Sequence, residues 1–274
     1  MIFPTGKKHT SFSEVKTWKE CSWRHKLSHI DKIDEFDQPS PYLYFGTCVH
    51  EGAESILNGK KIDREKLISV LTAAWEEHGF EKPEWYLEQP GWYKHEPLST
   101  WIEWVNNMWD DIPAFLDEQF PGWESIKAEE QLYEAIENKD FIFKGFIDGV
   151  IGITDKKGNK KVLIIDWKTA GSYGWRREKK QDIMMTAQLA LYKFYWSQKH
   201  DVPLKDIRCG FVLLKRGGKA GKTCEFVPVS VGPKTLAKSL KMVNDMISTV
   251  RKNIFLKNRN SCKYCQFKDT KYCT

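Results

Sequence analysis

The sequence predicts an α/β (α+β) fold in which a central mixed β-sheet is flanked by helices. Helical patterns dominate the first 120 residues, whereas residues 126–169 resemble successive strands rich in β-branched and aromatic side chains. A further helical pattern separates these strands from two more. Helices that precede a sheet, with one helix between its strands, are typical of this class. Because no linker-like stretch divides the 274 residues, we expect a single domain over 1–274.

The elements can be placed in order along the chain. Ser11 and Glu14 have the spacing of a capping box, which predicts a helix that continues to about residue 30. The Pro- and Gly-containing stretch 82–97 is expected to be a loop or lid. Residues of about 58–122 then form a helical insertion at the front of the domain. The expected helices are 42–57, 63–78, 98–120, 182–200 and 233–255, and the expected strands are 126–136, 141–153, 161–169, 207–214 and 224–231.

Composition limits the class of protein. Hydrophobic residues make up 41% and aromatic residues 14%, which excludes intrinsic disorder. No apolar run reaches the ~18–20 residues of a membrane helix, and the first eight residues lack a signal-peptide core. We therefore expect a cytoplasmic protein with no membrane partner, either cellular or encoded by a phage and acting in the host cytoplasm. The net charge of +6 permits a polyanionic partner without requiring one.

Two acids and a lysine form the sharpest chemical signal. Asp166 and Lys168 are two residues apart on an expected strand, so they share one face while Trp167 points to the other. A hairpin around the turn at 155–159 would bring Asp148 close to Asp166. Two close carboxylates repel each other, and a hard divalent cation such as Mg²⁺ removes that conflict. The alternative is a surface salt bridge between Asp166 and Lys168.

Four motifs in order strengthen the first interpretation. They are Phe45-Gly46-Thr47-Cys48-Val49-His50-Glu51, Gly145-Phe146-Ile147-Asp148, Val162-Leu163-Ile164-Ile165-Asp166-Trp167-Lys168-Thr169 and Gln188-Leu189-Ala190-Leu191-Tyr192. This set resembles the PD-(D/E)XK nuclease superfamily. More narrowly, it is similar to the RecB-like branch, which includes AddB-type nucleases, CRISPR-associated RecB-like exonucleases and the mitochondrial genome maintenance exonuclease. The resemblance covers nearly the whole chain and implies a restriction-endonuclease-like core.

The resemblance also implies an activity and a set of site residues. The activity is Mg²⁺- or Mn²⁺-dependent deoxyribonuclease action, as an exonuclease, on single-stranded DNA or duplex ends in DNA processing, recombination and repair. The implied metal ligands are Asp148 and Asp166, with His50 as a further ligand or a residue behind the ligands. For an earlier glutamate of the family, Glu129 and Glu130 compete, and we favour Glu130. The remaining implied catalytic residues are Lys168, as the catalytic lysine, and Gln188 and Tyr192, which share one helical face and help to place DNA.

Three of the seven cysteines lie close together at the end of the sequence. Cys262 and Cys265 have a chelating spacing, Cys273 follows, and Cys21 is the candidate fourth ligand. The resemblance to the iron–sulfur members of the branch implies a [4Fe–4S] cluster that joins residues 11–30 to residues 255–274. The alternatives are Zn²⁺ held by the same four thiolates and free thiols in a frayed tail.

A basic segment follows the strand that carries Asp166. We expect it to grip a phosphate backbone and to stack an end base, although a solvated start of a helix is the alternative. Its aromatic and basic members are Tyr173, Trp175, Arg176, Arg177, Lys179 and Lys180. The Gly- and Lys-rich stretch 215–223 lacks the spacing of a P-loop, so we expect a basic hairpin tip near DNA and no nucleotide-driven motor.

Two other functions stay open at this stage. The chain could be a catalytically silent DNA-binding or assembly subunit on the same fold. It could also be a metal-stapled protein-interaction module in which the acids only form salt bridges. A helicase or recombinase partner and the oligomeric state stay open as well.

Overall fold

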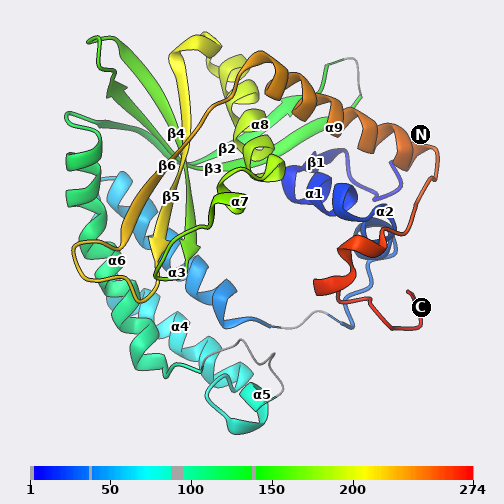
Figure 1. The fold of residues 1–274 in the computed structure, drawn as a ribbon, viewed down its shortest axis with the longest axis horizontal. Coiled ribbons are helices and arrows are strands. Elements are labelled where there is room, and N and C mark those ends of the chain that lie inside the picture. Colours follow the sequence, from blue (N-terminus) through cyan, green and yellow to red (C-terminus); the bar gives the residue numbers. More distant parts are fainter. Residues whose placement is uncertain (1–2, 37–38, 88–94, 138–139, 274) are drawn as a thin grey trace.

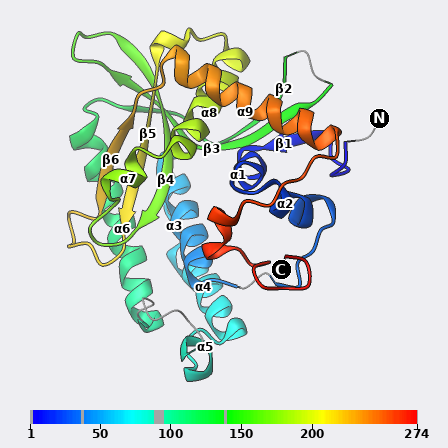
Figure 2. The same cartoon turned by 45° about the vertical axis from the view of Figure 1, so that its right-hand side comes forward.

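The fold is a six-stranded mixed β-sheet with helices on both faces, as the sequence predicts (Figures 1 and 2). The computed structural model describes residues 3–36, 39–87, 95–137 and 140–273. The strands follow the order β1-β3-β4-β5-β6, and β2 pairs with β3 outside this path. The strands are β1 (His9–Ser11), β2 (Glu124–Ala135), β3 (Ile142–Thr154), β4 (Lys160–Ala170), β5 (Ile207–Lys215) and β6 (Cys224–Val229).

Most helices lie within a few residues of their expected positions. They are α1 (Phe12–Glu20), α2 (Ser22–His25), α3 (Pro41–Leu57), α4 (Arg64–His78), α5 (Pro83–Leu87), α6 (Leu98–Gln119), α7 (Arg177–Lys180), α8 (Ile183–His200) and α9 (Pro233–Arg251). Short turns of other helix types are η1 (Lys26–Ile30), η2 (Leu204–Asp206) and η3 (Arg259–Tyr264). The helix expected to reach residue 255 ends earlier because Asn253 adopts a left-handed backbone with φ 55°.

Two parts of the chain differ from the sequence prediction. The helix expected over 11–30 is broken at Cys21, whose backbone is extended with φ −161° and ψ 110°. Ser11 does cap α1 by accepting from the Glu14 N–H, but the Glu14 carboxylate accepts from Thr10 Oγ1 at 3.2 Å and lies 3.0 Å from His25 Nε2. The loop expected over 82–97 contains the short helix α5, and its residues 88–94 lie outside the described residues.

Each face of the sheet is covered by its own apolar core. On one face, residues of α8 and α9 such as Leu191 and Val243 pack against Ile147 and Phe211 of the strands. On the other face, α3 and α6 cover the sheet, α4 packs on these two helices, and Trp167 of β4 belongs to the same core. Because neighbouring residues of a strand point to opposite faces, Asp166 and Lys168 are directed toward the α8 side. In the described residues, no helix is both long and apolar enough to span a membrane.

One edge of β3 is shared by two strands. Strand β2 follows one edge of β3 along nearly its whole length. On the other edge, β1 pairs with Ile142 to Lys144, whereas β4 pairs from Gly149 onward. The segment from Gly145 to Asp148 therefore faces an opening between β1 and β4. Asp148 lies where β3 and β4 separate.

The segment of α1, α2 and η1 lies against the C-terminal residues after α9 (Figures 1 and 2). Backbone Trp23 N–H donates to Leu256 O at 3.1 Å, and Trp23 Nε1–H donates to Tyr272 O at 3.1 Å. The Ser261 hydroxyl donates to Glu20 O at 2.7 Å. A small apolar cluster that includes Leu27 and Phe267 is buried between the two segments. The break at Cys21 thus falls where the first helices meet the C-terminal residues.

Candidate active site

The structure brings Asp148, Asp166 and Lys168 together at the end of the opening in the sheet. The Lys168 ammonium forms an ion pair with Asp166 Oδ2. The backbone N–H of Trp167 donates to Asp148 Oδ2 at 2.7 Å, so the side chain of Asp148 bridges the point where its strand leaves β4. Only 2% of the Asp166 side chain and 14% of the Asp148 side chain are exposed.

A side chain of α8 forms a hydrogen bond with Asp166. The Gln188 side-chain amide donates to Asp166 Oδ1 at 2.8 Å and lies 3.3 Å from the Tyr192 hydroxyl. Tyr192 approaches the sheet at Gly145, where an added Cβ would lie 2.9 Å from Tyr192 Cε1. Glycine at position 145 therefore leaves the space that the Tyr192 ring needs. Gln188 contacts Asp166 directly, whereas Tyr192 lies next to Gln188.

The charges of this group depend strongly on one another. Burial, and then the neighbouring Asp166, raise the pKa of Asp148 well above its usual value. Burial also raises the pKa of Asp166, although Lys168 opposes the shift. Burial alone would lower the pKa of Lys168, but Asp166 and Asp148 raise it overall. The lysine is therefore charged, whereas the two acids share a site that favours one proton or one additional cation.

His50 lies on α3 beside the acids. Its Nδ1 is 3.6 Å from Asp148 Oδ2. Burial, followed by the positive charge of Lys168, lowers the pKa of His50 to about 4. The imidazole is therefore neutral near pH 7, and a neutral imidazole nitrogen can bind a metal ion or accept a proton.

Glu130 does not join this group, which corrects the preference for Glu130 over Glu129. The buried carboxylate of Glu130 accepts from Trp196 Nε1–H at 2.6 Å and from Lys199 Nζ at 2.9 Å, and it lies 2.6 Å from His200 Nε2. Although burial opposes the change, these partners lower the pKa of Glu130. Its oxygens are thus fully occupied at the end of α8.

Glu129 is the glutamate that lies near the acids. It borders a hollow along α3 that is also lined by His50. Burial, followed by the charges of Glu54 and Asp166, raises the pKa of Glu129. Of the two glutamates, Glu129 is therefore the one that lies on the side of the acids.

The left-handed backbone of Glu129 explains why the side chains of Glu129 and Glu130 lie in different surroundings. Glu129 has φ 47°, which interrupts the alternation of faces along β2. Ala128 packs in the core under α3, while Leu132 packs in the core under α8. In a regular strand these two even-numbered residues would face the same side. The opposite position in β3 shows the same change, since Ile147 faces α8 and a Cβ on Gly149 would meet Leu57 of α3.

The basic segment after β4 is only partly available to a ligand. Trp175 is 6% exposed and packs 5.1 Å from the Phe211 ring, so it cannot stack on a base, which corrects that prediction. Lys180 forms an ion pair with Glu225 at 2.6 Å. Tyr173, by contrast, is 99% exposed. Arg176, Arg177 and Lys179 are exposed, and the Lys179 ammonium lies 4.7 Å from the Trp175 ring centre.

The four predicted cysteines of the chain ends line one pocket. Cys21, Cys262, Cys265 and Cys273 lie there with apolar neighbours such as Leu27 and Phe267. The Asn258 N–H donates to Cys21 Sγ at 3.4 Å, as amides often do to thiolate ligands. Across residues 3–36, 39–87, 95–137 and 140–273, however, no three His, Cys, Asp or Glu side chains stand in ligating geometry around one point.

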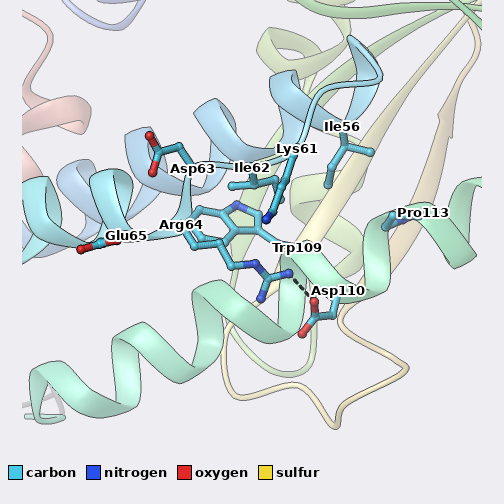
Figure 3. A pocket seen from close by; sticks show the side chains of 9 residues that line it. All are labelled: Ile56, Lys61, Ile62, Asp63, Arg64, Glu65, Trp109, Asp110 and Pro113. Atoms are coloured by element: carbon cyan, nitrogen blue, oxygen red, sulfur yellow. Dashed lines mark hydrogen bonds and ion pairs between the residues drawn. The ribbon is translucent and has the colours of Figure 1, made fainter.

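A separate hollow lies between α6 and the loop that joins α3 to α4 (Figure 3). The Arg64 guanidinium lies 5.8 Å from the Trp109 ring centre, pairs with Asp110 and donates to Asn106 Oδ1 at 3.0 Å. None of the residues that line this hollow belongs to the acidic site.

Comparisons with known proteins agree with this geometry. The model of the PD-(D/E)XK nuclease superfamily matches residues 9–270. Among solved structures, a candidate exonuclease from Eubacterium rectale is similar with a TM-score of 0.56 and 12% identity, over 96% of this chain and 89% of that chain. SSO0001 gives a TM-score of 0.33 and 15% identity over 93% and 92% of the two chains, which carries no argument. No curated protein sequence matches.

The family match spans nearly the entire chain and includes all four motifs that surround the acids. The structural likeness is limited to the fold because the identity is low. The chain belongs to the PD-(D/E)XK nuclease superfamily.

Proposed function

We propose that this protein is a Mg²⁺- or Mn²⁺-dependent deoxyribonuclease of the RecB-like branch that acts as an exonuclease on DNA ends. The observation that carries the proposal is the contact of Asp166 with both Lys168 and Gln188, beside Asp148. A chance surface salt bridge would leave the acid exposed, whereas Asp166 is almost fully buried.

The residues present suit a hard divalent cation. Asp148 and Asp166 would hold it, with His50 and Glu129 as the nearest further donors. Oxygen ligands with one imidazole are chemistry that Mg²⁺ and Mn²⁺ accept. Burial raises the pKa of both acids, and the charge of Asp166 adds to the shift of Asp148, so a bound divalent cation would relieve this cost. Bound there, a divalent cation supplies activation of water and neutralisation of phosphate charge.

The side chains of the protein contribute the remaining steps. The charged ammonium of Lys168 is positioned to stabilise the negative charge that grows on the phosphate and to orient the attacking water. Gln188 donates a hydrogen bond to one oxygen of the Asp166 carboxylate. This bond orients the carboxylate before a substrate binds. Neutral His50 would contribute a ring nitrogen to the cation or accept a proton.

The decisive experiment follows the digestion of end-labelled linear DNA, single-stranded and double-stranded, with Mg²⁺ and with EDTA. We expect Asp166→Ala and Lys168→Ala to lower the rate at least about 100-fold while the circular dichroism spectrum stays unchanged. Lys156→Ala, in the exposed turn at the far end of β3 and β4, is the matched control. An exonuclease should also leave circular DNA intact.

Other outcomes of these experiments would contradict the proposal. Full activity in Lys168→Ala would refute the assignment of the site. Salt-dependent DNA binding without cleavage would identify the silent subunit. Negligible DNA affinity that does not respond to salt would identify the protein-interaction module.

We further propose that Cys21, Cys262, Cys265 and Cys273 hold a [4Fe–4S] cluster. The support is that the four side chains line one pocket although Cys21 is more than 200 residues away from the others in sequence. Thiolate donors suit such a cluster, and they also suit Zn²⁺. Anaerobically purified protein should be brown, and Cys262→Ser should lose the visible absorption. A colourless protein that contains zinc would overturn this proposal.

A further inference from the structure

Arg216 stands at the same end of the sheet as Lys168. It directly follows β5, and its backbone N–H donates to Ala170 O at 2.9 Å. Ala170 is the last residue of β4 and comes two positions after Lys168. Arg216 belongs to the basic hairpin 215–223 that the sequence predicts to lie near DNA.

The Arg216 side chain lies on an aromatic platform. Its guanidinium carbon is 4.2 Å from the Tyr42 ring centre and 5.5 Å from the Trp101 ring centre. Trp101 is 1% exposed, so the platform is part of the core. Tyr42 also lines the hollow that contains His50 and Glu129. Arg216 is therefore held flat at the rim of the candidate active site.

The hairpin that carries Arg216 is fastened to α6. The Asp111 carboxylate accepts from the backbone N–H of Gly221 and of Thr223, both at 2.9 Å, and from Thr223 Oγ1 at 2.6 Å. Lys215 N–H donates to Thr223 O at 2.7 Å across the hairpin. Because the loop is fixed at both strands and at its tip, the position of Arg216 is set before any ligand arrives.

The charge of Arg216 is not neutralised by the protein. In the described ranges, no carboxylate forms an ion pair with Arg216, and its buried Nε has no hydrogen-bond acceptor. The charge of Arg216 also acts on a neighbouring cation: burial, then Lys16 and Lys168, and to a smaller extent Arg216, lower the pKa of Lys179 although Asp182 opposes the shift. A guanidinium that is held in place without a carboxylate partner favours the binding of an anion.

We propose that Arg216 binds a backbone phosphate of the substrate strand next to the phosphate that is hydrolysed, and so positions the strand over the acids. This inference rests on the proposed nuclease function and names one contact of that site. A guanidinium is suited to the task because it can stack on Tyr42 with its face and donate to phosphate oxygens with its edge. Lysine would keep the charge and lose the stacked geometry.

The test measures binding to single-stranded DNA in EDTA, where cleavage does not occur, at a series of salt concentrations. Arg216→Gln should bind about tenfold more weakly, and the slope of log K against log salt should fall by about 0.7, the value of one released counterion. Arg216→Lys should keep the slope but lose part of the affinity. Lys156→Gln removes one charge far from the acids and should change neither quantity.

The kinetics of DNA cleavage distinguish a role of Arg216 in positioning the strand from a role in folding. With Mg²⁺, Arg216→Gln should raise KM about tenfold and leave kcat within about threefold of the wild type, because Lys168 and the acids are untouched. If Arg216→Gln fails to fold, unchanged affinity in Arg216→Lys would overturn the inference and weakened affinity would support it. A wild-type slope in folded Arg216→Gln would overturn it while wild-type cleavage stands. A wild-type protein that neither binds nor cuts DNA would instead refute the proposed function.

Discussion

Asp148 shows how one buried side chain can favour function over stability. Its pKa is raised because it is desolvated and lies near Asp166, so the folded protein binds a proton there more readily than the unfolded chain does. Without metal, this site therefore stabilises the fold at low pH and loses that contribution as the pH rises through the raised pKa. At neutral pH, each unit by which the pKa of Asp148 is raised lowers the free energy of unfolding by about 1.4 kcal/mol.

Replacing Asp148 by asparagine should therefore stabilise the protein in EDTA. Asparagine keeps an oxygen that can accept from the Trp167 N–H but removes the buried charge. We expect the melting temperature at pH 7 to rise by about 2–4 °C for each kcal/mol gained. Added Mg²⁺ should raise the melting temperature of the wild type and leave Asp148→Asn unchanged. A lower melting temperature of Asp148→Asn in EDTA would contradict this account.

Glu130 provides the matched control of opposite sign. Its pKa is lowered by Lys199 and His200, so its contribution is present above its usual pKa and is lost on acidification. Glu130→Gln should therefore lower the melting temperature at pH 7. The sequence alone could not distinguish Glu129 from Glu130, because the left-handed backbone at Glu129 breaks the period-2 rule on which strand predictions depend.

At the scale of elements, the sequence predicted long periodic segments better than their interruptions. The hydrophobic pattern predicted β3, β4 and α8. These three elements carry Asp148, Asp166 and Gln188. The pattern did not predict β1, because a three-residue strand that pairs parallel with β3 has no pattern of its own. The sequence also predicted Trp175 to be a surface residue. The basic residues around Trp175 give no local sign that its ring packs on Phe211.

The contact between β3 and α8 gives a prediction about Gly145. In Gly145→Ala, the new methyl group would press on the Tyr192 ring and on Phe143, which lies 3.2 Å from the added Cβ. The shift of Tyr192 should move Gln188 and misorient Asp166. We expect kcat to fall about tenfold or more with KM little changed.

Gly152→Ala, on the same strand, is the control because its Cβ would meet only ordinary contacts at 3.8 Å or more. Both variants add one methyl group to β3, so equal losses of activity in the two would attribute the effect to the strand and not to Tyr192.

At the scale of the whole molecule, the first and last segments depend on each other. The sequence suggested this only through the resemblance that joined Cys21 to the C-terminal cysteines. The structure adds contacts that no cysteine spacing reveals, such as Ser261 Oγ to Glu20 O and Trp23 Nε1 to Tyr272 O. Short polar segments of this kind carry too little hydrophobic pattern to predict their partners.

Loss of the proposed cluster should therefore loosen both ends together. In Cys262→Ser, we expect faster amide hydrogen exchange in residues 12–30 and in residues 252–273, with the exchange of β4 unchanged. The Leu27 and Phe267 cluster should weaken along with the hydrogen bonds at Leu256. Increased exchange at only one end would show that the segments are stabilised independently.

The divided edge of β3 has a consequence for how this architecture tolerates change in length. Two added residues in β1 would extend its pairing with β3 toward Asp148 and so disturb the strand that carries this acid. The turn at Asp155–Asn159 lies at the far end of the hairpin of β3 and β4, so an insertion there would lengthen an exposed tip without touching the acids. Natural length variation should accordingly collect in the distal turn and avoid His9 to Ser11.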